Sequence, residues 1–350
     1  MTYTRIKKLS SMEQLNGKYP LTHAHLQQIT RDRADVKAIL ENQDSRLLMI
    51  IGPCSAWPEA AVLEYAQRLS ILNKKIGHVL KCVMRVYIQK PRTTTGWMGP
   101  VNQPDPFAKA DIEAGLAYSR AMMIAVIHLG LAIADEALFT DNASGFLNLL
   151  SWVAIGARSS EDPQHRVFAS TLDCAVGLKN PTHGSLVIGV NSVIAAQSAQ
   201  VTMLDGYEIQ SHGNSHAHLV LRGSNQAANY SLAHLNEVHQ LMTQHGIQNP
   251  ALLIDVSHDN CLLEGKKHPH LQPDIVFAIL DSLKNQPELK PLIKGFMVES
   301  FLTAGSQLID VNHPDALDLN GLSITDPCLS WQQTETFLLT LATRLTSGAT

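Results

Sequence analysis

The sequence predicts an α/β fold, a TIM (β/α)8 barrel with an amino-terminal extension. Three observations lead to this prediction. Eight short apolar runs recur along the 350 residues with helical stretches between them, the runs are continuous rather than alternating, and each ends in polar or charged residues. Continuous apolarity is typical of parallel strands covered on both faces, and eight strand–helix units match a closed barrel. The pattern leaves an open doubly wound sheet as the alternative.

The candidate strands also indicate where the barrel begins. In chain order the runs are RLLMIIG, HVLKCVMRVY, LAIADEAL, WVAIGAR, AVGLKN, HLVLRG, ALLIDVSH and KGFMVES. Residues 58–72, 112–129 and 331–345 carry apolar side chains at helical spacing. We therefore expect residues 46–350 to form the barrel domain and residues 1–45 to form a separate extension, polar at first and helical from 23 to 42.

Composition excludes several classes of function. With 27 basic and 31 acidic residues the net charge is −4, so no overall positive field attracts nucleic acid or an acidic membrane surface. The longest apolar stretch, 121–134, is interrupted by His128 and Gly130, which argues against a membrane span. Five scattered cysteines without CxxC pairs argue against a disulfide framework or zinc knuckle, and we expect a cytoplasmic protein.

Cations follow many of the candidate strands. In a barrel the carboxyl ends of all strands open onto one face, where catalytic groups lie. Such a group of like charges requires anions nearby, most plausibly substrate phosphates or carboxylates, although a single arginine at a strand end is more often a surface ion-pair partner. The cations are Arg85, Lys90, Arg92, Arg158, Lys179 and Arg222.

A second set of strand-end residues offers sulfur, nitrogen and oxygen ligands. Cys54, His258, Glu299 and Asp326 form this set. Mixed ligands suit a divalent transition metal such as Mn, Fe, Co or Zn better than Mg or Ca, which prefer oxygen alone. A single buried cysteine is usually only a small apolar residue, so the prediction depends on the four together. The tract with His212, His216 and His218 is interpreted as a solvated loop running into a strand.

Eight motifs occur in the order known from one enzyme family. They are GPCS at 52–55, KPRTT at 90–94, SWVAIGAR at 151–158, GLKN at 177–180, LRGS at 221–224, IDVSH at 254–258, VES at 298–300 and SITD at 323–326. Together they resemble the class I DAHP (3-deoxy-7-phosphoheptulonate) synthases of bacteria and fungi, from about Arg46 to Leu345.

The resemblance implies a metal-dependent condensation of phosphoenolpyruvate with erythrose 4-phosphate, the first step of the shikimate pathway, by a homo-oligomer. It implies metal ligands at Cys54, His258, Glu299 and Asp326, with phosphoenolpyruvate bound by Arg85, Arg158, Lys179 and Arg222. Lys90 would lie near the aldehyde, and Arg92 and Thr93 would hold the sugar phosphate. Glu136 would orient the attacking water, and we expect Lys179 and His258 to be catalytic as well.

Departures from the family pattern concern regulation and fine specificity. The family's IHDP after GPCS is replaced by Ala56, Trp57, Pro58 and Glu59. Phe139 replaces an acid, and residues 143–145 replace PQY. Residues 191–222 are shorter than in feedback-sensitive relatives, and Asp173 stands where those relatives often carry serine. A carboxylate disfavours burial of an aromatic ring beside it, so we expect no ordinary phenylalanine or tyrosine inhibition.

Two other functions fit part of the sequence. A synthase that uses arabinose 5-phosphate shares the barrel and the phosphoenolpyruvate chemistry, but KPRTT argues against it. A non-catalytic paralogue that serves as a binding or regulatory subunit is favoured by the altered loop after the third strand. Retention of all four candidate metal ligands argues against that alternative.

Overall fold

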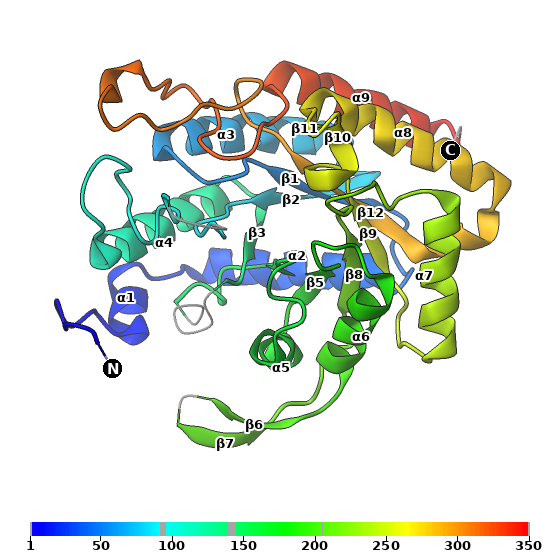
Figure 1. The fold of residues 1–350 in the computed structure, drawn as a ribbon, viewed down its shortest axis with the longest axis horizontal. Coiled ribbons are helices and arrows are strands. Elements are labelled where there is room, and N and C mark those ends of the chain that lie inside the picture. The colour runs from blue at the N-terminus through cyan, green and yellow to red at the C-terminus, as the bar shows by residue number, and fades with distance from the viewer. Residues whose placement is uncertain (1, 92–95, 139–144, 205, 349–350) are drawn as a thin grey trace.

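The computed structural model describes residues 2–91, 96–138, 145–204 and 206–348. Eight parallel strands form a closed barrel in the order β1-β12-β9-β8-β5-β4-β3-β2, which confirms the predicted fold (Figure 1). The first strand pairs with the last, for example Leu48 with Gly295. The barrel strands are β1 (Leu47–Gly52), β2 (Leu80–Arg85), β3 (Ala132–Glu136), β4 (Trp152–Ile155), β5 (Ala175–Lys179), β8 (Ala217–Leu221), β9 (Leu252–Asp255) and β12 (Ile293–Glu299).

Helices surround the barrel and cover the outer face of the sheet. Several begin where the sequence supplies a cap: Thr22 and Ser330 both form capping boxes with the residue three positions later. The helices are α1 (Met12–Lys18), α2 (His23–Leu40), α3 (Glu59–Ile76), α4 (Ile112–His128), α5 (Pro163–Thr171), α6 (Leu186–Gln197), α7 (Leu232–Gln244), α8 (Gln272–Ser282) and α9 (Trp331–Thr346). None of the helices in the described ranges has the length and apolarity needed to cross a bilayer.

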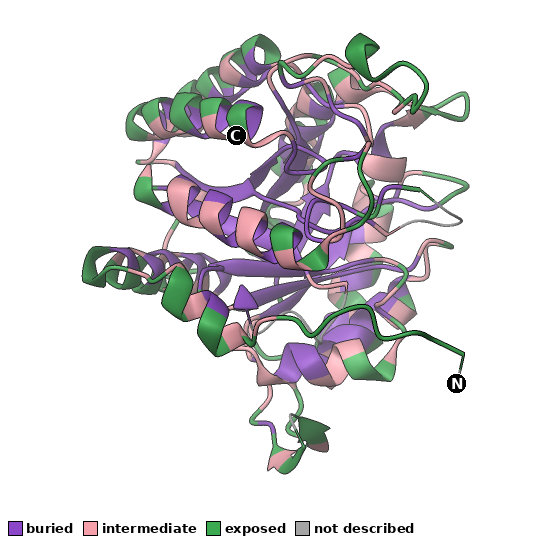
Figure 2. Cartoon of the chain, turned by 90° about the vertical axis from the view of Figure 1, so that its left-hand side faces the viewer, coloured by how far each residue is buried: buried purple, intermediate pink, exposed green. Residues whose placement is uncertain are grey.

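Alternate side chains of each strand enter two different apolar clusters. Inside the barrel Ile50, Val83 and Trp152 pack together, whereas Ile51 and Met84 belong to the larger cluster between strands and helices. Both faces of the sheet are therefore buried, which explains the continuous apolar runs. Figure 2 shows the buried strands at the centre and helices whose outer sides are exposed.

Helix α2 contacts β1, β3 and β5 and contributes to the interior of the barrel. Its residues Val36, Ile39 and Leu40 belong to the apolar cluster inside the barrel. Two carboxylates of the same helix, Asp32 and Asp35, accept hydrogen bonds from Lys81 at 2.6 and 2.7 Å. The amino-terminal segment is thus packed against the barrel through apolar contacts and buried ion pairs.

One helix and two antiparallel hairpins were not predicted. Helix α1 begins at a capping box formed by Ser11 and Gln14. The antiparallel pair β6 (Val201–Leu204) and β7 (Tyr207–Gln210) projects away from the barrel, as Figure 1 shows. A shorter hairpin, β10 (Leu262–Leu263) and β11 (Lys266–Lys267), follows β9. These elements are short, so the periodicity that reveals long elements is weak in them.

Candidate active site

The strand ends place most of the expected residues at the carboxyl-terminal end of the barrel. Arg85, Glu136, Lys179 and Glu299 are the last residues of β2, β3, β5 and β12. Cys54, Arg222 and His258 follow β1, β8 and β9 within three residues. Because parallel strands of a barrel all point the same way, these side chains come from different strands yet meet at one end.

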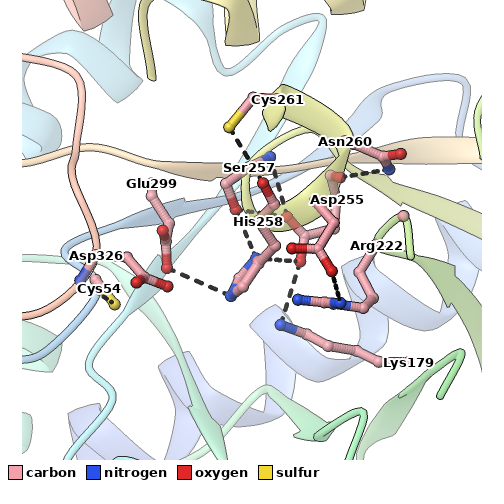
Figure 3. Close-up of polar contacts among 12 residues, drawn as sticks. Cys54, Lys179, Arg222, Asp255, Ser257, His258, Asn260, Cys261, Glu299 and Asp326 are labelled. Carbon is pink, nitrogen blue, oxygen red and sulfur yellow. Dashed lines mark hydrogen bonds and ion pairs between the residues drawn. The ribbon is translucent and has the colours of Figure 1, made fainter. Parts of the chain in front are cut away.

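Three of the four expected metal ligands form one cluster. The ligand atoms of Cys54, Glu299 and Asp326 all lie within 4.8 Å of one another. His258 lies beside this cluster, with Nε2 3.7 Å from Glu299 Oε1 (Figure 3). Cys54 and Glu299 are 1% exposed, whereas the Asp326 side chain is 36% exposed, so the cluster is buried on one side and reaches solvent at Asp326.

Neighbouring groups hold His258 in its orientation. Its Nδ1 lies 2.8 Å from Asp255 Oδ2 and 2.8 Å from Ser257 Oγ. The other ring nitrogen is therefore the one that faces Glu299, an arrangement typical of histidines that bind metals. The backbone of His258 has a φ of 49°, which is uncommon for a residue other than glycine.

The donor set fits a divalent transition metal. Burial, reinforced by the charge of Glu299, raises the pKa of the Cys54 thiol, so ionisation of this thiol needs further positive charge nearby. Burial alone would also raise the pKa of Glu299, but the charges of His258 and Arg85 lower it below the ordinary value. A thiophilic cation would stabilise the thiolate form of Cys54, and the two carboxylates and the imidazole beside it would be further ligands of that cation.

Cys54, Glu299 and Asp326 each also contact a lysine or arginine of the protein. Lys90 Nζ lies 3.1 Å from Cys54 Sγ and donates to the Cys54 carbonyl oxygen at 2.6 Å. Arg85 donates to Glu299 Oε1 at 2.9 Å, and Lys267 donates to Asp326 Oδ2 at 2.5 Å. The cluster is thus partly neutralised by fixed charges of the chain.

Arg85 has an unused hydrogen-bond donor. The side chain is completely buried and lies with its guanidinium carbon 4.1 Å from the centre of the Tyr87 ring. Its Nη1 has no hydrogen-bond partner among the described residues. A buried, charged donor left unpaired is costly, so its position indicates a site for an anionic group.

Two further cations lie on the other side of His258. Lys179 Nζ is 3.2 Å from Asp255 Oδ2, and Arg222 pairs with Asp259 (Figure 3). The cations thus have anions beside them, as expected, but part of this negative charge comes from carboxylates of the protein, which pair with Arg85, Lys179 and Arg222. Carboxylates between strand-end cations keep these long side chains extended toward a common centre.

The Glu136 side chain occupies space that is free because residue 156, directly after β4, is a glycine. It is 6% exposed, and a Cβ atom at Gly156 would lie 2.4 Å from its Oε1. Gly156 belongs to the SWVAIGAR motif, so the motif supplies space for this carboxylate as well as the following arginine. Any larger residue at 156 would force the Glu136 side chain to move.

Arg158 is placed differently from the other cations. It lies in the turn after β4 and is exposed, in contrast to the buried Arg85 and Lys179. Arg92 and Thr93 lie outside the described residues. Of the three histidines before and within β8, His212 is exposed, His216 contacts Glu41 at 2.7 Å, and His218 lies buried in the strand.

Sequence reasoning missed Lys267 and the carboxylates that position the cations. Lys267 lies in β11, part of a hairpin that was not predicted, and nothing in its GKKH context marks a site residue. Asp255 lies inside the IDVSH motif, and its buried position in a strand was a usable signal, because a buried aspartate normally has a charged or hydrogen-bonding partner.

A closed barrel with buried cations and a thiol–carboxylate cluster at its carboxyl-terminal end defines a barrel enzyme for anionic substrates. The model of the DAHP synthetase I family matches residues 22–339. The chain belongs to this family and is an enzyme of the class I DAHP synthase type.

Individual relatives agree with this assignment. A Tyr-sensitive phospho-2-dehydro-3-deoxyheptonate aldolase of Salmonella typhimurium is 37% identical over 340 residues, 94% of this chain and 91% of that protein. A phospho-2-dehydro-3-deoxyheptonate aldolase of Corynebacterium glutamicum is 35% identical over 96% of this chain and 91% of its own length. The structure of phospho-2-dehydro-3-deoxyheptonate aldolase from Francisella tularensis SCHU S4 matches with a TM-score of 0.88 and 31% identity, over 98% of both chains.

Proposed function

We propose that this chain condenses phosphoenolpyruvate with erythrose 4-phosphate, with the help of a divalent transition metal, to give DAHP and inorganic phosphate. The observation that carries the proposal is the convergence of Cys54, Glu299 and Asp326 within 4.8 Å, beside the unpaired donor of Arg85. A group of sulfur and oxygen ligands beside a cationic hydrogen-bond donor suits a reaction between an electrophilic carbonyl and a phosphorylated enol.

The cations of the site would bind and orient phosphoenolpyruvate. Arg85 offers its unpaired Nη1 from a completely buried position, and Lys179 and Arg222 are 2% and 8% exposed. Held between them, the enol would present its third carbon to the aldehyde, and fixed orientation of two reactants removes much of the entropic part of the barrier. In this proposal Arg158 would add a further contact from the turn after β4.

Other residues of the chain would serve the second substrate and the water. Lys90, fixed on the Cys54 carbonyl oxygen at 2.6 Å, would donate a hydrogen bond near the aldehyde oxygen, while Arg92 and Thr93 would hold the sugar phosphate. Glu136 would orient water toward the second carbon of the enolpyruvyl unit. As the carbon–carbon bond forms, water adds at that carbon, and cleavage of its bond to the phosphate oxygen then releases phosphate.

Cys54, His258, Glu299 and Asp326 would hold the metal. When bound, Mn, Fe, Co or Zn would supply a Lewis acid for the aldehyde carbonyl. His258 would also have a catalytic role. Asp255 contacts both His258 and Lys179, so a metal ligand and a cation proposed to bind phosphoenolpyruvate share one carboxylate.

One assay tests the reaction directly. Purified protein loaded with each metal in turn would receive phosphoenolpyruvate and a panel of phosphorylated aldoses, and loss of the enolpyruvate absorbance would be followed. We expect turnover with erythrose 4-phosphate and little with arabinose 5-phosphate. Preference for arabinose 5-phosphate would assign the chain to the other synthase type, and no turnover with any aldose would support a regulatory paralogue.

We also propose that ordinary aromatic feedback is absent, although a relative is Tyr-sensitive by name. Asp173 is 80% exposed and pairs with Arg33 at 2.7 Å, so a charged pair stands beside the shortened segment. Val201, Met203 and Tyr207 of the neighbouring hairpin are exposed, at 68%, 79% and 73%. A pocket that buries an aromatic ring needs apolar walls, and the ion pair of Asp173 with Arg33 places charge at this position instead.

Inhibition titrations would test this proposal. Phenylalanine, tyrosine and tryptophan at millimolar concentration should leave the rate nearly unchanged. Strong inhibition by any of the three would show that an effector pocket exists in another form.

We also propose that the enzyme is a homo-oligomer of the cytoplasm. A homo-oligomer is supported by the exposed apolar side chains of β6 and β7, since patches of this kind commonly mark protein interfaces. A reducing cytoplasm is supported by the five cysteines, all of which are free and buried. Sedimentation of the purified enzyme would give the oligomeric state.

A further inference from the structure

A small aromatic cluster lies apart from the main cores. Trp57, Trp97 and Ile324 are 8%, 6% and 5% exposed and form a separate apolar cluster, which we call the tryptophan clasp. The two indole rings meet edge to face, with centroids 6.3 Å apart. Edge-to-face contacts of buried aromatic rings add stability beyond the area that they bury.

Hydrogen bonds attach the clasp to the loop between β2 and α4. Trp57 Nε1 donates to the Pro104 carbonyl oxygen at 2.8 Å, and Trp97 Nε1 donates to the Gln103 carbonyl oxygen at 2.7 Å. The backbone of the same loop is closed where the amide of Lys90 donates to the Met98 carbonyl oxygen at 2.9 Å. The loop that carries Lys90 is therefore fixed at Lys90 itself and again at residues 97–104.

The clasp also joins the loops of two candidate metal ligands. Trp57 is three residues after Cys54, and Ile324 is two residues before Asp326. Ile309 and Leu317, from the loop between β12 and α9 that is orange in Figure 1, pack against the same cluster. Three loops from β1, β2 and β12 thus share one small apolar contact at the end of the barrel where the site lies.

We propose that Trp57 is a positioning residue for the second substrate, and this rests on the proposed condensation. Through Trp97 and Pro104 it fixes residues 96–104, to which the Lys90 backbone is hydrogen-bonded, relative to Cys54 and Asp326. The substrate class affected is the phosphorylated aldose, because the proposed function places Lys90 near its aldehyde. In the proposed function phosphoenolpyruvate would be bound by Arg85, Lys179 and Arg222, which are buried residues at strand ends outside the clasp.

Sequence supports a role particular to this chain. Trp57 occupies one of the four positions where the family's IHDP is replaced. An indole at this position makes both the ring contact and the hydrogen bond to Pro104, so a smaller side chain would lose both. Displacement of a substrate-binding group by about 1 Å can lower a rate by roughly a hundredfold.

Two variants test the proposal, because it predicts a change in the KM for erythrose 4-phosphate without an equal change in the KM for phosphoenolpyruvate. Trp57→Ala should raise the KM for erythrose 4-phosphate about tenfold and change the KM for phosphoenolpyruvate less than about twofold. Trp57→Phe keeps a ring but loses the hydrogen bond, and should raise the first KM by about two- to threefold. The phenylalanine variant provides the answer if the alanine variant does not fold.

Trp331→Phe is the matched control. Trp331 is also 8% exposed and makes an edge-to-face contact, with Tyr65 at 5.5 Å, in the main core. The Trp331→Phe substitution should lower the melting temperature without changing one KM value more than the other. Equal changes of both KM values in the Trp57 variants, no change in either, or the same separation in Trp331→Phe would overturn the proposal. A wild-type enzyme that uses no phosphorylated aldose would overturn the proposed function first, and this inference with it.

Discussion

The two ends of the barrel both bury charge, but they use it differently. At the amino-terminal end, Lys81 is neutralised by Asp32 and Asp35 of one helix, at 2.6 and 2.7 Å. At the carboxyl-terminal end, cations pair with acids from other strands, and Arg85 Nη1 has no hydrogen-bond partner within the described ranges. The first arrangement brings one cation together with two acids and supports the fold, whereas the second leaves a buried cationic donor for a ligand. Polar burial alone therefore does not reveal a site, and an unpaired donor indicates one only where charged residues from other strand ends converge with it, as they do at Arg85.

Replacement of a buried cysteine at each end gives the largest expected difference. Cys54→Ala should lower metal occupancy sharply and activity by more than about a hundredfold, because a ligand of the cluster is lost. Cys82→Ala removes an equally buried thiol from β2, 1% exposed, and should affect only stability. Metal analysis and steady-state kinetics would check both. Full activity of Cys54→Ala, or of exhaustively metal-free enzyme, would remove the metal from the proposed mechanism.

The next comparison is between cations of the proposed substrate site and Lys81 at the other end of the barrel. Lys179→Ala and Arg222→Ala should lower kcat/KM for phosphoenolpyruvate by about ten- to a hundredfold, because each removes a charge-assisted contact. Lys81→Met should lower the melting temperature but leave both KM values unchanged. Arg92→Ala should chiefly raise the KM for erythrose 4-phosphate. Unchanged aldose kinetics in this last variant would refute the placement of the second substrate.

Lys267 sharpens the comparison within the active site itself. Its ammonium lies 2.5 Å from Asp326 Oδ2, so it competes by charge with a metal bound there. Lys267→Met should therefore tighten metal binding by about tenfold in a chelator competition, since a like charge is removed. Lys266→Met, next to it and exposed, should bind metal as the wild type does. Weaker binding in Lys267→Met would mean that the lysine mainly orients Asp326.

Lys294 gives the smallest effect, one on stability. It is 3% exposed, its Nζ has no hydrogen-bond partner in the described part of the chain, and burial lowers its pKa to about 8. Since an unfolded lysine titrates near 10.4, the unfolded state binds more protons between these values, and stability should rise with pH from about 8 to about 10.4. At neutral pH Lys294→Met should raise the melting temperature by a few degrees. Thermal melts should show a smaller gain in melting temperature for Lys294→Met at pH 10 than at pH 7. A gain independent of pH would contradict the prediction. Lys8→Met, at an exposed lysine, is the control.

The sequence was informative where an element is long or a residue ends a strand. All eight barrel strands were predicted because their apolar runs reflect burial on two faces, and Arg85, Lys179 and Glu299 could be recognised from their place at the ends of those runs. Helix α1 and the β6–β7 hairpin were missed, although the Ser11–Gln14 box and the Asp205–Gly206 pair are known signals. Asp255 could have been suspected from its place in a buried strand, but Asp259 and Lys267 could not be assigned, because pairing across loops depends on three-dimensional packing.

Closure of the barrel between β1 and β12 has a consequence for how the chain can fold. Leu48 pairs with Gly295, so the first strand has no neighbour on one side until nearly the whole polypeptide has been synthesised. Contacts of such large sequence separation slow folding, and an unpaired strand edge invites association with other chains in the interval. Helix α2 precedes β1 and contacts it in the finished barrel, so it can shield that strand as soon as both have been synthesised.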